Sequence, residues 1–104
     1  MDSQLKKGLL EYCILAFLNK NDSYGYQIVK EINPLLTISE STLYPILRRL
    51  EAAGKVEIYA KAHNGRQRKY YRITQEGQAS VRKFLTADWP QLELIKEFIA
   101  EQNV

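Results

Sequence analysis

The sequence predicts a mainly α fold with one small β-hairpin, arranged as a winged helix-turn-helix (three helices plus a β-wing) and followed by a long C-terminal dimerisation helix. Three observations predict it. An amphipathic helical pattern with a glycine stop covers 39–54, an Asn-Gly hairpin signal lies at 64–65, and an apolar helical repeat follows from 74 onward. We therefore expect a winged helix-turn-helix domain at 1–74 and a dimerisation helix at 75–104.

Length and composition are those of one small globular domain. The chain has 104 residues, of which 45% are hydrophobic, enough for a limited core. No apolar run reaches about 18 residues and the first residues lack a signal-peptide apolar region, so we expect a cytoplasmic protein with no membrane span. The lone cysteine, Cys13, lies in an apolar segment and is expected to be a buried small hydrophobe. It cannot form an intrachain disulfide, which fits a reducing compartment.

The positive charge is concentrated in the middle of the chain. Residues 44–72 hold eight Lys or Arg and two acidic residues, a net charge of +6, whereas the rest of the chain carries −3. A segregated basic region favours phosphate binding more than the overall charge of +3 does. The alternative is a solvated basic surface without a partner.

The first expected helix covers residues 5–18 and is apolar nearly all round. Such a helix must be covered on more than one face. One face can pack on its own domain, and the other predicts a second chain or a second layer.

The second expected helix covers 24–32 and ends before Pro34, with Ser23 as a plausible N-cap. Gly25 lies in its first turn, where it costs about 1 kcal/mol of helix propensity. A glycine there is useful if another backbone, from DNA or a neighbouring helix, approaches closely.

The third expected helix has one apolar arc and one polar face. The apolar arc is formed by Leu43, Ile46, Leu47 and Leu50. The opposite face carries hydroxyls, a phenol and guanidiniums, and its members are Ser41, Thr42, Tyr44, Pro45, Arg48 and Arg49. Such a face suits the edges of a DNA major groove.

The two ends of this helix carry different signals. Ser39 and Ser41 compete as N-cap, and Pro45 favours the later start because proline is tolerated in a first turn. Gly54 is well placed as the C-terminal cap. For Arg49, the alternative to a role on the polar face is an ion pair with Glu51 or another nearby acid.

A hairpin is expected at 55–74, with Asn64-Gly65 as a type I′ turn. A two-residue loop places Glu57 opposite Arg72 as an opposite-charge pair. One face of the hairpin base is then apolar, formed by Val56, Ile58, Tyr71 and Ile73. The tip is basic and is formed by Lys61, His63, Arg66, Arg68 and Lys69. We therefore interpret the hairpin as a projecting wing that contacts DNA backbone beside the third helix.

The last segment shows a heptad-like seam. Thr74 is its N-cap candidate, and the seam runs through Val81, Leu85, Asp88, Leu92, Ile95 and Ile99. We expect this helix to pair with its mate and with the first helix of the chain. Pro90 should kink or break it, and the alternative is two helices at 75–88 and 91–102.

These residues resemble the PadR-like family of transcriptional regulators. The matching pieces are Tyr24-Gly25-Tyr26, the run from Ser41 to Glu51, Gly54, the run from Gly65 to Thr74, and Gly77. The resemblance covers most of the chain, and the short tail after Trp89 is similar to the compact subfamily with one C-terminal helix.

The resemblance implies a homodimer, a repressor role and a double-stranded DNA operator near a regulated gene. It also implies that some members bind planar aromatic effectors against a tryptophan of the last helix. Trp89 is the only tryptophan here, and it lies one residue later than that tryptophan, counting from Thr74. One residue turns a side chain by about 100° on a helix. At the position of Ser41, members of the family often have glycine.

The candidate sites follow from these observations. The residues expected to contact DNA are Tyr24, Ser41, Thr42, Tyr44, Arg48, Lys61, Arg66, Arg68 and Lys69. Trp89 is the candidate effector-binding residue. We expect no cofactor, no metal site and no enzymatic activity, because one His and one Cys cannot close a metal site and no catalytic spacing is present. The alternative function is a winged-helix module that binds a protein or RNA through its basic face.

Overall fold

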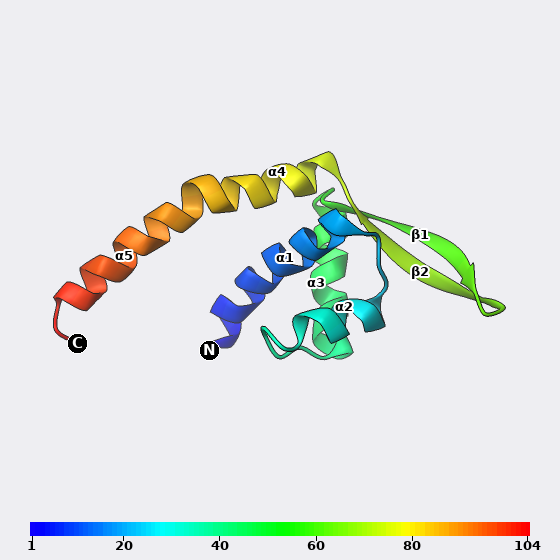
Figure 1. Ribbon diagram of the computed structural model, residues 1–104, viewed down its shortest axis with the longest axis horizontal. Coiled ribbons are helices and arrows are strands. Elements are labelled where there is room, and N and C mark those ends of the chain that lie inside the picture. The colour runs from blue at the N-terminus through cyan, green and yellow to red at the C-terminus, as the bar shows by residue number, and fades with distance from the viewer.

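The computed structural model describes residues 1–104, and its extents of 59 × 26 × 21 Å reflect an elongated molecule. A body of three helices lies in the middle, a two-stranded hairpin projects from one side, and a helical arm extends from the other (Figure 1). This is the mainly helical, winged helix-turn-helix architecture that the sequence predicts. No helix is both long and apolar enough to cross a bilayer.

The first helix, α1 (Ser3–Lys20), is longer than expected. The carboxylate of Asp2 caps it by accepting from the amides of Gln4 and Leu5, at 2.9 and 3.4 Å. Its inner face supplies four core residues, Leu10, Ile14, Leu15 and Leu18. Cys13 is only partly buried against the core rather than fully enclosed.

In the second helix, α2 (Gly25–Ile32), the N-cap position is occupied by Tyr24 and not by Ser23, and the Tyr24 side chain makes no capping hydrogen bond. Ser23 is instead paired with the hairpin: its amide donates to the Tyr71 carbonyl at 3.2 Å, and the Tyr71 amide donates to its carbonyl at 2.8 Å. Ser23 is therefore held in extended backbone as a bridge to the hairpin, which leaves Tyr24 as the residue that enters the helix.

The third helix, α3 (Glu40–Ala52), begins at the earlier of the two expected positions. Ser39 is the N-cap, and its hydroxyl accepts from the Thr42 amide at 3.3 Å. The later start that Pro45 favoured is wrong. Pro45 leaves only the carbonyl of Ser41 without its helical donor, and Ser41 is exposed to solvent at the helix start.

The end of α3 is a glycine cap, as predicted. Gly54 has a φ of +74°, a left-handed conformation that glycine adopts without a steric penalty. The amide of Gly54 donates to the Glu51 carbonyl and that of Lys55 to the Leu50 carbonyl, both at 2.9 Å. This pair of bonds is a Schellman motif. It turns the chain directly into the hairpin.

The hairpin has the predicted register. Strands β1 (Val56–His63) and β2 (Arg66–Ile73) pair antiparallel from Val56 opposite Ile73 to His63 opposite Arg66. The turn residues Asn64 and Gly65 both have positive φ, 51° and 77°, as a type I′ turn requires. The apolar residues of its base pack on the helical body.

One hydrophobic core lies where the three helices meet the hairpin base. The four expected residues of α3 are all buried in it. Its full set is Leu10, Ile14, Leu15, Leu18, Ile28, Ile32, Ile38, Leu43, Ile46, Leu47, Leu50, Val56 and Tyr71. Because α3 commits its apolar arc to this core, its opposite face is left outside.

The helical arm comprises α4 (Gln75–Lys83), a π-helical segment η1 (Phe84–Asp88) and α5 (Trp89–Glu101). Thr74 caps it as predicted, accepting from the Gly77 amide at 3.1 Å. Pro90 does not break the arm, which continues as one curved helical path (Figure 1). The helical conformation changes from α to π at 84–88, directly before Pro90.

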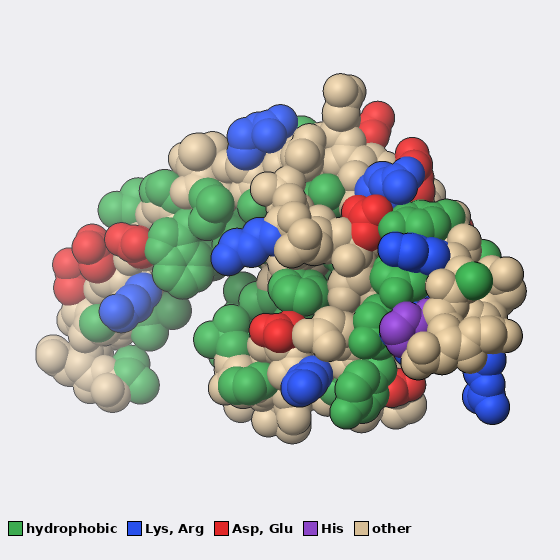
Figure 2. Space-filling model, turned by 45° about the vertical axis from the view of Figure 1, so that its right-hand side comes forward, with side chains coloured by type: hydrophobic (Ala, Val, Ile, Leu, Met, Phe, Trp, Pro, Cys, Tyr) green, Lys and Arg blue, Asp and Glu red, His purple; other side chains and the backbone are tan.

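The arm leaves most of its apolar side chains uncovered. No residue of α5 is buried, and the exposed fractions of Leu92, Ile95 and Ile99 are 39%, 47% and 53%. Figure 2 shows hydrophobic side chains gathered along the arm. The apolar residues of the expected seam from Leu85 onward therefore lie on the surface, whereas Val81 at its start packs against the core.

Candidate nucleic-acid interface

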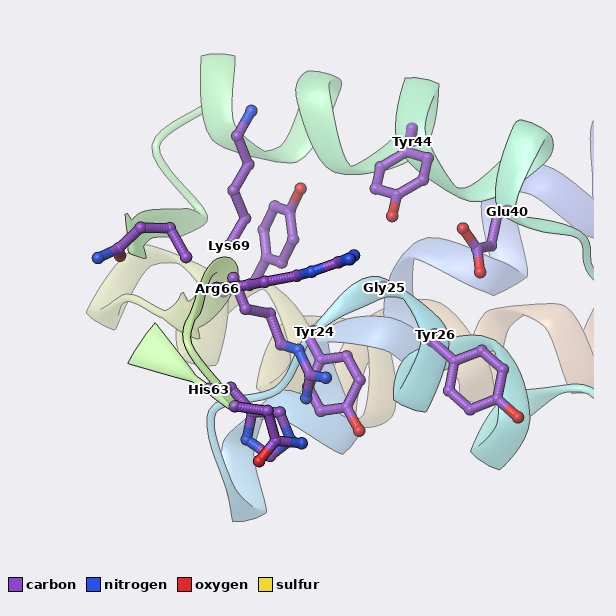
Figure 3. A pocket seen from close by; sticks show the side chains of 12 residues that line it. Tyr24, Gly25, Tyr26, Glu40, Tyr44, His63, Arg66 and Lys69 are labelled. Atoms are coloured by element: carbon purple, nitrogen blue, oxygen red, sulfur yellow. The ribbon is translucent and has the colours of Figure 1, made fainter. Parts of the chain in front are cut away.

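A hollow of about 710 Å³ lies between the wing and the N-terminal ends of α2 and α3 (Figure 3). The wing side supplies the cations Arg66, Arg68 and Lys69, together with His63. The opposite side supplies tyrosines and a single acid, Glu40. A hollow with three cations, one acid and several phenols suits a phosphate backbone with adjoining base edges.

The outer face of α3 lies beside this hollow. Ser41, Tyr44 and Arg48 are exposed and Thr42 is half-buried. The Ser41 hydroxyl lies 2.9 Å from the Ser39 hydroxyl, which also donates to the Thr42 hydroxyl at 3.2 Å. The two predicted hydroxyl contacts are therefore held by the cap residue, and Arg48 is the long, free side chain of this face.

Tyr44 packs against another helix and is also partly exposed to the hollow. Its ring lies directly over Gly25, where a Cβ would collide with the phenol oxygen and the ring. The group that approaches Gly25 closely is therefore the side chain of Tyr44 and not the expected backbone. Burial, followed by the charge and hydrogen bond of Glu40, raises the pKa of Tyr44 above its ordinary value. Tyr44 remains 36% exposed, so one edge of its ring stays available in the hollow.

Arg68 and Lys61 lie against tyrosine rings on the solvent face of the hairpin. The Arg68 guanidinium lies 3.9 Å from the centroid of Tyr24, and the Lys61 ammonium lies 5.5 Å from that of Tyr70. The edge of one ring meets the other, with 5.5 Å between the centroids of Tyr24 and Tyr70. Cation–π contact restrains both cations while leaving their N–H donors free.

Arg72 pairs with Asp22, so the predicted pairing of Arg72 with Glu57 is wrong. Its Nε donates to Asp22 Oδ2 at 3.2 Å, although Glu57 faces Arg72 in the strand register. Asp22 also accepts from the Tyr59 hydroxyl at 2.7 Å. The hydrogen bond to Asp22 raises the pKa values of both Tyr59 and Arg72. The bridge at Ser23 explains the partner, because it places Asp22 beside β2.

Arg49 forms the ion pair that was the alternative to a groove contact, but its partner is Glu11 and not Glu51 or a neighbour of Glu51. Its Nε donates to Glu11 Oε1 of α1 at 2.7 Å, and its terminal nitrogen lies 2.6 Å from the same oxygen. The pair links α3 to α1. Arg49 is therefore turned away from the polar face of α3.

The remaining wing residues, His63, Arg66 and Lys69, are exposed near the tip (Figure 3). The structure also adds residues to the hollow that the sequence pattern missed, namely Tyr26, Glu40 and Gln67. Tyr26 is 62% exposed and Glu40 is the first residue of α3. Choosing Ser39 as the N-cap would have made Glu40 the first residue of α3. It would then have indicated Glu40 as a lining residue, because the first helical residues are the ones that face a groove.

Trp89 lies outside this hollow, on the arm. It is 45% exposed, and its ring meets the edge of Phe84 with 6.0 Å between centroids. Phe84 in turn stacks on Tyr12 of α1, with 4.0 Å between centroids and 16° between planes. Tyr12, Phe84 and Trp89 thus form an aromatic cluster at the junction of α1 and the arm.

Comparison with known proteins agrees with this architecture. The family model described as the transcriptional regulator PadR-like family matches residues 14–83. A transcriptional regulator from Mycobacterium tuberculosis is 31% identical over 102 residues, covering 96% of this chain and 92% of that protein.

Solved structures are similar over nearly the whole chain. A PadR-like transcriptional regulator from Bacillus cereus has a TM-score of 0.79 and 32% identity, covering 94% of this chain and 97% of that one. A protein from Streptococcus mutans has a TM-score of 0.75 and 44% identity, covering 92% and 90% of the two chains.

Proposed function

Because the chain belongs to the PadR-like family of transcriptional regulators, we propose that it is a homodimeric, sequence-specific repressor that binds a double-stranded DNA operator. The observation that carries the proposal is the basic and phenolic hollow between the wing and the start of α3. It lies where a winged helix-turn-helix meets the groove and the flanking backbone at once.

In this proposal α3 reads bases and the wing binds phosphates. Arg48 is exposed on α3 and hydrogen-bonds to no other residue, so its guanidinium is free for a guanine edge. Thr42 is the second reader, through its hydroxyl or methyl group. Arg66, Arg68 and Lys69 on β2 supply backbone contacts that set orientation without reading sequence.

A second copy of the chain would cover the arm. Leu92, Ile95 and Ile99 expose an apolar surface that a monomeric soluble protein rarely leaves open. The outer face of α1, where Leu5 is 57% exposed, would be covered with it. A twofold dimer places two α3 helices on half-sites about one helical turn apart.

Trp89 is the proposed contact for a small aromatic effector. The π segment supports this assignment, because it contains one residue more than the same length of α-helix. The Trp89 side chain therefore points in the direction that a residue one position earlier would have in a regular α-helix. A planar ligand beside Trp89 would also touch the cluster that joins the arm to α1. Quenching of Trp89 fluorescence by a panel of planar aromatic compounds tests this part, and an unchanged spectrum across the panel would contradict it.

The central test is a gel shift with the DNA upstream of the protein's own gene, compared with random DNA of equal length at several salt concentrations. We expect tighter binding to the upstream fragment and a steep loss of affinity with salt, because several phosphates are contacted. Equal affinity for both DNAs would contradict sequence-specific repression and would favour an RNA or protein partner.

Two classes of variant separate reading from backbone binding. Thr42→Ala and Arg48→Ala should each reduce the preference for operator over random DNA. For Arg48→Ala the reduction should be about 1–3 kcal/mol, the size of a bidentate base contact. Lys69→Ala should weaken binding to both DNAs by a similar factor and lower the salt slope by about 1. An unchanged preference in Arg48→Ala would exclude Arg48 as a reader.

A further inference from the structure

We propose that Lys6 and Lys7 of α1 form a second phosphate-binding edge, which holds the DNA strand on the opposite side of α3 from the wing. The inference rests on the proposed DNA-binding function and adds a contact surface to it. Neither lysine lies in the basic segment 44–72 that predicts DNA binding from sequence.

The surface is a second hollow, of about 440 Å³, between the start of α1 and the start of α3. Its polar lining consists mainly of two lysines and several hydroxyls, with Ser3, Lys6 and Lys7 from α1 and Thr37, Ser39 and Thr42 from the chain entering α3. No carboxylate lines it. A hollow with two cations, hydroxyl donors and no acid is suited to an anion with several oxygens.

The two hollows lie on either side of the start of α3 and share no residue. Glu40 and Tyr44 line the hollow on the wing side, whereas Ser39 and Thr42 line the hollow on the α1 side. Thr42 and Tyr44 are two positions apart, which turns their side chains about 200° from one another on a helix. The first turn of α3 is thus a partition between two basic surfaces.

This arrangement matches the geometry of a helix in the major groove. The groove is about 12 Å wide and is bounded by the phosphates of both strands. A helix that enters it therefore has one backbone on each side. The wing can reach only the backbone on its own side, and Lys6 and Lys7 are the cations on the other side.

The side chains are suited to this role. Lys7 is exposed and Lys6 is half-buried, so the stem of Lys6 can pack while its ammonium reaches solvent. Asp2 lies four residues before Lys6 and Glu11 four residues after Lys7. The Asp2 carboxylate accepts from two amides at the start of α1, and the Glu11 carboxylate accepts from Arg49. The positive end of the α1 dipole adds to the attraction for phosphate.

The test is the variant Lys6→Gln/Lys7→Gln, assayed by fluorescence anisotropy on the upstream fragment and on random DNA. We expect a similar loss of affinity for both DNAs and a salt slope lower by about 0.9 for each phosphate contact removed. The matched control is Arg82→Gln/Lys83→Gln, which removes the same charge from an exposed adjacent pair on α4, outside both hollows. The control should keep the wild-type slope, and thermal melting should show both variants folded.

A second measurement locates the contact. Single phosphates on each side of a half-site are replaced by neutral methylphosphonates, and the affinity lost on each replacement is compared among proteins. The wild type should lose affinity on both sides. Lys69→Gln should become insensitive at one phosphate on the wing side, and Lys6→Gln/Lys7→Gln should become insensitive on the other side.

The outcomes separate the two proposals. A Lys6→Gln/Lys7→Gln variant with the wild-type salt slope and wild-type sensitivity on both sides overturns the second edge, while operator binding by the wild type stands. A wild type that does not prefer the upstream fragment overturns the proposed function. A slope that falls equally in the control shows a general charge effect and also overturns the second edge.

Discussion

The guanidinium of Arg68 on β2 lies 3.9 Å from the centroid of the Tyr24 ring at the start of α2. This contact connects the wing to the helix-turn-helix. It continues along the solvent face of the hairpin, because Tyr24 meets the edge of Tyr70, Tyr70 stacks on Tyr59, and Tyr59 donates to Asp22. The orientation of the wing relative to α3 is therefore restrained by a continuous row of side chains.

Replacing Tyr24 should weaken DNA binding through Arg68. Tyr24→Leu removes the aromatic face, and we expect about a two- to fivefold loss of affinity, the size of an exposed cation–π contact. Tyr24→Phe keeps the face and should bind nearly as the wild type does. A double-mutant cycle with Arg68→Ala, measured by fluorescence anisotropy, checks the link. Additive losses from the two positions would show that Tyr24 does not act through Arg68.

Gly77 should tolerate no side chain. A Cβ there would overlap the carbonyl oxygen of Lys55 and lie 2.7 Å from Cγ1 of Ile73. The overlap is with backbone, so we expect Gly77→Ala to destabilise the fold by about 1–3 kcal/mol despite the better helix propensity of alanine.

Thermal unfolding measures this effect, with Gly8→Ala as the matched control. Gly8 also lies inside a helix, but a Cβ there meets nothing within 4 Å. Gly8→Ala should raise Tm by a few degrees, because alanine stabilises a helix by up to about 1 kcal/mol relative to glycine. Equal shifts in the two variants would show that the packing at Gly77 is not the cause.

The parts of the fold that local patterns determine were predictable. The Asn64-Gly65 turn and the alternating apolar residues set the hairpin register, because a slip of one residue would expose the apolar face. The helical spacing of the apolar arc placed Leu43 and Leu50 in the core. The outward direction of Arg48 follows from the same wheel.

Contacts between distant segments were not predictable from spacing. Asp22 pairs with Arg72 only because the Ser23 bridge places the two segments side by side. Predicting the start of α3 at Glu40, directly after the Ser39 cap, required weighing that cap against Pro45, and the solvent exposure that makes Pro45 tolerable is a property of the folded chain. The π segment before Trp89 has no recognised sequence pattern, and it changes the phase of every residue after it.

Tyr59 should make stability depend on alkaline pH. Its hydrogen bond to Asp22 raises its pKa in the folded protein above the unfolded value of about 10. The hydroxyl therefore stabilises the fold below about pH 10, and this contribution is lost as pH rises through the folded pKa. We expect Tyr59→Phe to lower stability at neutral pH and to flatten the decline above pH 10.

Denaturant unfolding between pH 7 and 11 checks this expectation. Tyr26→Phe is the control, because it removes the hydroxyl of a tyrosine that is 62% exposed and makes no hydrogen bond in the structure. The control should follow the wild-type curve. A Tyr59→Phe curve parallel to that of the wild type over the whole range would show that Asp22 does not hold the phenol proton.

The apolar face of α5 should determine the oligomeric state. Ile95 lies near the middle of this face and is 47% exposed in the single chain. In the proposed dimer, Ile95→Glu would bury a carboxylate in an apolar interface, which costs several kcal/mol. We expect a monomer in analytical ultracentrifugation at micromolar concentrations. Loss of the dimer should also weaken operator binding, because each half-site would then be bound independently.

The control for Ile95→Glu is Ala100→Glu, which adds the same charge to the same helix. The two side chains are about 140° apart around the helix, so Ala100 lies on the polar side together with Glu93 and Glu97. Ala100→Glu should leave the dimer intact. Because α5 contributes no buried residue, Ile95→Glu should leave the rest of the chain folded. The helical signal in circular dichroism should therefore stay close to that of the wild type. A dimer that persists in Ile95→Glu would show that the arm is not the dimer interface and would leave α1 as the remaining apolar surface for self-association.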